Sequence, residues 1–128
     1  MAVPYVIVLR KNPKDKTAPA KYYAQAKSRG EFTFRMLCRE ISDGSTTVSD
    51  TDVMAVLNDL LKILKRHLSN GEIVRLDEFS NLRISFGSEG AETEEKFNSS
   101  MIRDPKVLFD PGQDLEEMLN NLKFEKLK

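Results

Sequence analysis

Residues 48–85 read VSDTDVMAVLNDLLKILKRHLSNGEIVRLDEFSNLRIS, and this stretch contains the strongest structural signals of the sequence. Its apolar residues recur at intervals of three and four from Val53 onward, which predicts one long amphipathic helix. Ser49 is a favourable N-cap for that helix, with Asp52 three residues later in the capping-box position. Gly71 follows the last apolar residue of the pattern and is the expected stop. The stretch therefore predicts a long capped helix that leads directly into a sheet.

This predicted helix is apolar over more than the single stripe that a surface helix needs. One row of leucines forms its main face, and Val56, Leu61 and Ile63 lie beside that row. A stripe about 100° wide is enough for one buried face, so the excess predicts burial on two sides and indicates a dimer. The alternative is that N-terminal strands of the same chain cover the additional surface. The predicted dimer core comprises Val56, Leu57, Leu60, Leu61, Ile63, Leu64, Leu68, Phe79 and Phe109.

Upstream of this stretch the sequence predicts a hairpin and a first helix. Residues 4–11 are rich in β-branched side chains and residues 20–28 can return as a second strand. Residues 12–19, NPKDKTAP, have the composition of a turn. Gly30 interrupts the pattern, and residues 31–42 then have apolar side chains at helical spacing.

Downstream the sequence predicts three strands and a last helix. The strands are expected over residues 72–79, 81–86 and 102–110, with a turn between the first two. Asp110 is the expected N-cap of the last helix and Pro111 its first residue. The order is therefore ββ-αα-βββ-α, an α+β fold in one domain of residues 1–128.

Between the last two strands, residues 87–100 read GSEGAETEEKFNSS, with four glutamates against the single lysine Lys96. Glycine, serine and like charges disfavour a regular element here. We therefore expect a short or mobile connector, exposed from Glu89 to Lys96.

The net charge of zero conceals two oppositely charged parts. Residues 1–30 carry seven Lys or Arg and one Asp, hence +6, and the remaining 98 residues carry 13 basic and 19 acidic side chains, hence −6. Any attraction to a polyanion would therefore come mainly from the first 30 residues. No segment has the roughly 20 apolar residues of a membrane span, and the N-terminal charges are in the wrong order for a secretory signal. We expect a cytoplasmic protein that does not bind membranes.

Few residues have the chemistry of a reactive site. His67 has no cysteine or carboxylate at metal-ligand spacing, so we expect a surface or dimer-edge histidine near a helix C-terminus. Cys38 lies on an apolar helix face, which predicts a buried thiol. Tyr22 and Tyr23 could stack on bases, but packing across the hairpin, with one ring on each face, is the favoured interpretation. We expect no catalytic residue, no metal site and no cofactor.

The stretch 48–85, together with FDPGQDLEEML at 109–119, resembles the HU/IHF family of bacterial histone-like DNA-binding proteins. That family has a long dimerising helix, a glycine turn, two strands, an arm and a last helix. The residues that match its pattern are Gly71, Leu76, Phe79, Phe109, Gly112 and Leu115. With the N-terminal hairpin, the chain looks like a variant branch of the family over essentially its whole length. The resemblance implies an intertwined, non-enzymatic dimer that binds the DNA minor groove, bends the duplex and neutralises phosphates.

Several positions depart from that family. The arm of the family is basic, whereas residues 87–100 are acidic and contain no proline; Gln113 replaces a lysine, and Glu78 and Ser80 replace two glycines of a turn. We therefore expect a homodimer that binds duplex DNA weakly and largely without sequence specificity. The candidate DNA-binding residues are Arg10, Lys11, Lys14, Lys16 and Lys21 on the hairpin and Arg75, Arg83, Arg103 and Lys106 on the sheet. The alternative is a dimeric scaffold for a protein partner, which could add a strand to an exposed N-terminal edge.

Overall fold

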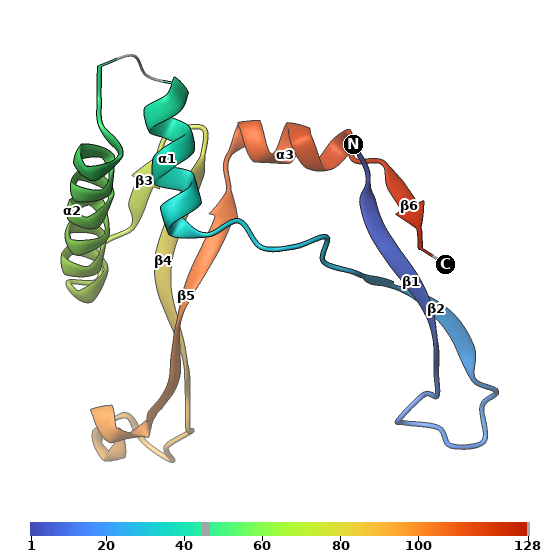
Figure 1. Ribbon diagram of the computed structural model, residues 1–128. Coiled ribbons are helices and arrows are strands. Elements are labelled where there is room, and N and C mark those ends of the chain that lie inside the picture. The colour runs from blue at the N-terminus through green and yellow to red at the C-terminus, as the bar shows by residue number, and fades with distance from the viewer. Residues whose placement is uncertain (45–46, 128) are drawn as a thin grey trace.

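A computed structural model describes residues 1–44 and 47–127. These residues form three α-helices and two small sheets, spread along an open arch (Figure 1). The helices are α1 (Phe34–Gly44), α2 (Asp50–Ser69) and α3 (Gln113–Asn120). The strands are β1 (Val3–Arg10), β2 (Lys21–Ala26), β3 (Val74–Leu76), β4 (Ser80–Ser88), β5 (Ile102–Pro111) and β6 (Phe124–Lys126). This confirms the predicted mixed α and β composition.

The predicted boundaries of the long helix are confirmed in α2. The Ser49 side chain accepts a hydrogen bond from the Asp52 amide at 3.1 Å, which satisfies one otherwise unpaired donor of the first turn. At the other end the Gly71 amide donates to the Leu68 carbonyl at 3.0 Å. Gly71 has a φ of 83°, a left-handed conformation that glycine adopts without steric cost. Neither α2 nor any other helix of the described residues is long and apolar enough to cross a membrane.

The three strands predicted downstream of α2 form one sheet of order β3-β4-β5, which is antiparallel throughout. The helix α2 packs against α1 and against β3 and β4, and Cys38 of α1 and Val53 of α2 are buried. The prediction that Cys38 is a buried thiol is therefore confirmed. Strand β3 is shorter than predicted, and the turn that follows it occupies residues 77–79, with Asp77 in a left-handed conformation at a φ of 49°.

The β4–β5 arm is longer than the sequence indicated. The two strands stay paired as far as Ser88 and Ile102, past a bulge at which Asp104 has a φ of 52°. The connector then folds into two single 3₁₀ turns, Glu94–Lys96 and Ser99–Met101, with Thr93 and Asn98 as their N-caps. Local side-chain caps hold this tip, a feature that overall composition did not indicate. The four glutamates of the tip are exposed, as expected.

The predicted start of the last helix is wrong by two residues. Asp110 and Pro111 still belong to β5, where Pro111 pairs with Ser80, and the N-cap is Gly112. Strand pairing therefore overrides the local preference of Asp-Pro for a helix start. The first helix likewise begins at Phe34 rather than at residue 31, because Glu31 and Phe32 remain in the extended linker 27–33.

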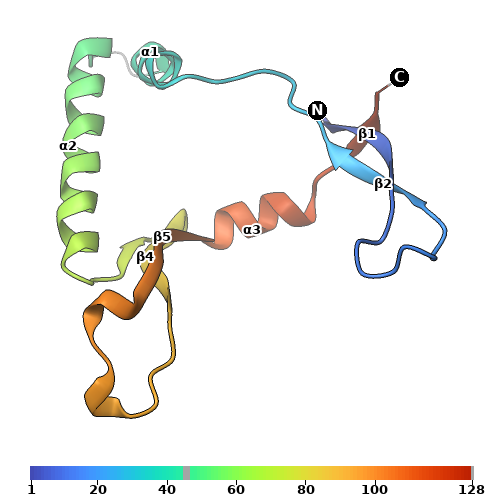
Figure 2. The same cartoon turned by 90° about the horizontal axis from the view of Figure 1, so that it is seen from below.

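The second sheet contains one strand, β6, that the sequence pattern did not predict. Its order is β2-β1-β6: β1 pairs with β2 as the predicted antiparallel hairpin, and with β6 in parallel through Val3–Phe124 to Tyr5–Lys126. The N-terminal hairpin is thus completed by the last strand of the described chain. Both views place this sheet apart from α1 and α2, connected to them by the 27–33 linker and α3 (Figures 1 and 2).

Gly112 lies directly against the turn between β3 and β4. Its amide donates to the Phe79 carbonyl at 2.8 Å, and a Cβ at this position would lie 2.2 Å from the Glu78 carbonyl oxygen. Phe79 and Phe109 meet edge to face in the same region, with ring centroids 5.9 Å apart. Glycine is therefore required here by the close approach of two backbone segments, because any side chain would push them apart.

Ser80, the first residue of β4, is a buried polar residue. Its side chain is fully buried, and its Oγ has no hydrogen-bond partner among the described residues. A buried polar group without a partner costs free energy, so Ser80→Ala should be neutral or raise the free energy of unfolding by about 1 kcal/mol. Urea denaturation of both proteins measures this. A clear loss of stability in the alanine variant would mean that the hydroxyl has a partner, such as a bound water.

The chain exposes far more surface than a compact monomer of its mass. Its accessible surface is 11191 Å², whereas a compact 14.6 kDa protein exposes about 6,900 Å². About 4,300 Å² is therefore in excess. Much of it is apolar: Val56, Leu61 and Ile63 of α2 are 65, 55 and 47% exposed, and Phe79 and Phe109 are about half exposed.

Candidate nucleic-acid interface

The hairpin presents its basic residues from an ordered tip. Strands β1 and β2 are paired up to Arg10 and Lys21. Beyond them, the Asn12 side chain accepts from the Lys14 amide at 2.9 Å, and the Asp15 carboxylate accepts from the Thr17 amide at 3.0 Å. These local bonds fix the loop that separates the lysines.

Asp15 is the single acid among the basic residues of this tip. The hydrogen bond from the Thr17 hydroxyl, strengthened by the Thr17 amide, holds the pKa of the Asp15 carboxyl below its ordinary value. Asp15 therefore stays ionised and anchors the loop at neutral pH. It offsets one positive charge but leaves the tip strongly basic.

All five hairpin candidates are exposed, and three of them line one cleft. The cleft has a volume of 560 Å³ and includes Arg10, Lys11 and Lys21 with Tyr23 beside them. Arg10 also donates to the Gln25 side chain at 3.2 Å, which orients its guanidinium along β2. Tyr22 and Tyr23 pair across the hairpin with Leu9 and Val8, so their rings lie on opposite faces, as predicted.

The sheet candidates are less available than the hairpin candidates. Arg83 forms an ion pair with Asp110 at 3.4 Å, and Arg103 forms one with Glu89. Among the ion pairs of the described residues, none involves Arg75 or Lys106. Two of the four sheet candidates are therefore already partly neutralised by carboxylates of their own chain.

The arm tip is electrostatically unsuited to a polyanion. Lys96, its one basic residue, is paired with Glu92 at 3.2 Å, which leaves the remaining glutamates in excess. In Figure 1 the arm and the hairpin both extend away from α3, the arm ending in acidic and the hairpin in basic residues. The acidic and the basic residues therefore lie at the ends of two separate projections, the arm and the hairpin.

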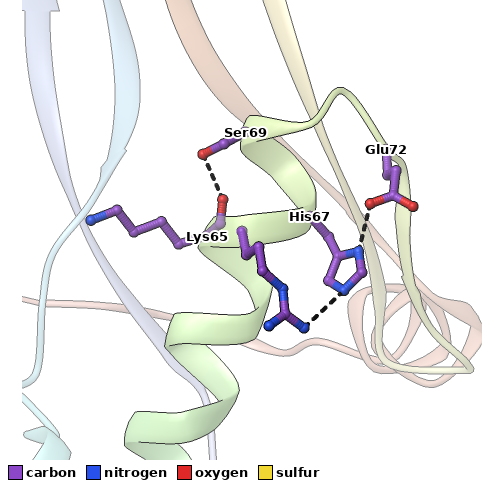
Figure 3. A network of polar contacts seen from close by, with 5 residues as sticks. Lys65, His67, Ser69 and Glu72 are labelled. Atoms are coloured by element: carbon purple, nitrogen blue, oxygen red, sulfur yellow. Dashed lines mark hydrogen bonds and ion pairs between the residues drawn. The ribbon is translucent and has the colours of Figure 1, made fainter.

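The histidine lies in a polar network at the end of α2 (Figure 3). His67 Nδ1 lies 2.5 Å from the Glu72 carboxylate, and its Nε2 lies 3.4 Å from an Arg66 guanidinium nitrogen. Ser69 donates to the Lys65 carbonyl at 2.6 Å in the last turn. Sequence spacing missed the His67–Glu72 pair because the chain reverses at Gly71. Within the part of the chain that is described, no three metal-ligating side chains gather in one place.

Glu72 gives this network a pH dependence. The hydrogen bond from His67 holds the pKa of the Glu72 carboxyl below its ordinary 4.5. A lowered folded-state pKa contributes stability that is present above 4.5 and lost as the pH falls through the lowered value. We expect Glu72→Gln to lower the melting temperature slightly at neutral pH and to match the native protein in acid. Glu116→Gln, which changes an exposed acid of α3, is the control; equal shifts in both variants would argue against the network.

The chain matches a known protein family over almost its whole length. Residues 1–126 match the family HU-HIG, described as an HU domain fused to wHTH, Ig, or Glycine-rich motif. The chain belongs to the HU-HIG family. The match runs through the N-terminal hairpin, the helix pair, the acidic arm and β6, so the expected HU-type resemblance is confirmed over the hairpin as well as the core.

A solved structure has the same fold as this HU-HIG chain. It is a crystal structure of a candidate bacterial DNA-binding protein from Bacteroides vulgatus, with a TM-score of 0.69 and 13% sequence identity. The match covers 98% of this chain and 48% of that one, so the HU-HIG chain spans about half the length of its structural neighbour. No curated protein matches the chain.

Proposed function

We propose that this HU-HIG protein is a non-enzymatic, nucleoid-associated DNA-binding homodimer of the bacterial cytoplasm. The observation that carries the proposal is the ordered hairpin tip, on which Arg10, Lys11, Lys14, Lys16 and Lys21 are all exposed. Lysine and arginine side chains on one projection favour contacts with backbone phosphates rather than with base edges. The HU-type family supports DNA as the partner.

Binding is weak and largely independent of sequence. The Glu89–Arg103 and Asp110–Arg83 pairs remove positive charge from the sheet, and the acidic arm tip repels a duplex. The hairpin must therefore supply most of the phosphate contacts. Each contact contributes about 0.9 to the slope of log affinity against log salt concentration.

The homodimer accounts for the uncovered side of α2. Val56, Leu60 and Ile63 repeat at intervals of four and three, the spacing of a helix–helix seam, and all three are exposed in the single chain. A second copy that packs on this stripe would place two basic hairpins in one particle. Light scattering on a gel-filtration peak measures the mass, and a single-chain mass at micromolar concentration would contradict the dimer.

Titration of a fluorescent duplex at two salt concentrations tests the function. We expect binding to intact and nicked duplexes at low salt, with a steep loss of affinity as salt is added and little dependence on sequence. The absence of binding to either duplex at low salt would rule out the proposal.

A second candidate is a dimeric scaffold for a protein partner, which the acidic arm tip favours. A partner strand would add at the edges of the N-terminal sheet, which belong to β2 of the hairpin and to β6, because β1 is the central strand. Capture from lysate before and after nuclease treatment separates the candidates. Partners that survive nuclease favour the scaffold, and partners that disappear favour DNA.

A further inference from the structure

One face of the β2-β1-β6 sheet carries mainly apolar and aromatic side chains, with Lys126 on its edge strand β6. Leu9 lies opposite Tyr22 and Val3 opposite Phe124, and Ile7 shares the face of Leu9 because alternate residues of a strand point to the same side. We call Ile7, Leu9, Tyr22 and Phe124 the clasp face. Their exposed fractions are 46, 57, 73 and 66%. Side chains of this kind normally pack against a second layer.

The opposite face of the same sheet is covered better along β1, whereas Tyr23 of β2 is 49% exposed on that face. On β1 it carries Pro4, which is buried, and Val6 and Val8, which are half-buried. The β1–β2 pair of this mixed sheet is antiparallel, and the face that antiparallel strands leave to solvent is typically polar, unlike the clasp face. A small sheet also needs a hydrophobic face packed against another element to be stable. The clasp face is therefore an unpaired half of a core.

Among residues 1–44 and 47–127, no helix packs on the clasp face in this arrangement. Figures 1 and 2 both place the sheet across an open space from α1 and α2. Those helices also have uncovered apolar sides. On α1, Phe34, Leu37 and Ile41 recur at intervals of three and four and are 37–42% exposed. The protein thus has a sheet without a helical layer and a helical layer without a covering sheet.

We infer that the clasp face packs on the α1–α2 layer of a second copy of this chain, so that each N-terminal sheet completes the core of its partner. The inference rests on the homodimer proposed above and identifies its main contact. The area favours it: about 4,300 Å² of excess surface per chain is well beyond the roughly 800 Å² per partner of a standard interface. Contact through the α2 stripe alone would leave the clasp face in water, with its four residues 46–73% exposed.

The hairpin can pack on the partner chain and contact DNA at the same time. The clasp face lies on the paired strands, whereas Lys11, Lys14 and Lys16 lie in or beside the loop beyond Arg10 and Lys21, where pairing ends. A sheet seated on the partner therefore leaves its basic tip in solvent. The contact also fixes the distance between the two tips of the dimer, which a flexible extension would not do.

Fluorescence provides a direct test, because the protein has no tryptophan. Tyr22→Trp places a reporter on the clasp face, and Tyr23→Trp places a matched reporter next to it on the opposite face. Each is measured in the native background and with the dimer broken by Leu60→Glu and Ile63→Glu. We expect the Tyr22→Trp emission to be blue-shifted in the dimer and red-shifted in the broken chain, with little change for Tyr23→Trp. Emission from Tyr22→Trp that is the same in both backgrounds overturns the inference, because the face is then either open or covered by its own chain.

A second experiment does not depend on the broken background. Ile7→Glu with Leu9→Glu should weaken dimerisation at least a hundredfold in sedimentation analysis. Lys11→Glu with Lys16→Glu, on the same hairpin, should leave the dimer intact and weaken DNA binding. An unchanged dissociation constant in the first variant overturns the clasp while the DNA titration still stands. A blue-shifted Tyr22→Trp dimer that binds no DNA would instead refute the proposed function and retain the clasp.

Discussion

Charge reversal at Lys11, Lys14 and Lys16 is expected to abolish most of the DNA affinity of this protein. The three lysines are exposed on an ordered loop, and a dimer presents them twice. If each neutralises one phosphate, their loss lowers the salt slope by about 5 and replaces attraction with repulsion. We expect at least a hundredfold weaker binding at low salt, measured by fluorescence anisotropy at several salt concentrations.

The control for this experiment carries the same change of net charge elsewhere. Lys62, Lys65 and Lys123 are also exposed, but they lie on α2 and after α3, away from the hairpin tip. Their reversal to glutamate should lower affinity only through the general field of the protein, which salt screens. Equal losses in the two triple variants would assign binding to net charge and would contradict a local role for the tip.

Among glycine-to-alanine substitutions in this chain, Gly112→Ala should cause the largest loss of stability. The new Cβ would lie 2.2 Å from the Glu78 carbonyl oxygen and 2.9 Å from the Phe79 carbonyl carbon. Both neighbours are backbone atoms held by hydrogen bonds from Gly112 and Asp114, so relief requires movement of the β3–β4 turn away from α3. We expect a loss of about 3 kcal/mol, near the upper end for overpacked sites.

Gly90→Ala is the matched control for that variant. A Cβ at Gly90 would meet no described atom within 4 Å, so its effect should stay within about 0.5 kcal/mol. Chemical denaturation of both variants compares them under the same conditions. A stable Gly112→Ala protein would mean that the turn can move at little cost, which would remove the physical reason for glycine at this position.

Local signals were the ones that sequence reasoning interpreted correctly. The Ser49 cap, the Gly71 stop and the apolar spacing of α2 all act within a few residues, and the structure confirms each of them. The Asp110-Pro111 helix start is equally local and was wrong. It failed because pairing of Pro111 with Ser80, a contact between distant parts of the chain, extends β5 through those residues.

The candidate DNA-binding site also combines features set by nearby residues with features set by contacts between distant residues. The basic composition and turn residues of the first 30 positions were enough to locate the hairpin and its lysines. The neutralisation of Arg103 by Glu89 and the His67–Glu72 pair could not be predicted, because each depends on where a chain reversal brings a side chain. The composition gives the number of positive charges, and the folded geometry decides how many of them remain available to contact DNA.

The helix pair, the hairpin, the acidic arm tip and the family could all be inferred from the amino-acid sequence, because they depend on periodicity, caps and composition within short windows. Only the tertiary structure decided that β6 joins β1, that Gly112 touches the β3–β4 turn, and that the terminal sheet lies apart from the helices with its clasp face uncovered. The physical reason is range: β6 and β1 are separated by more than a hundred residues, and no local preference encodes which distant strand completes a sheet.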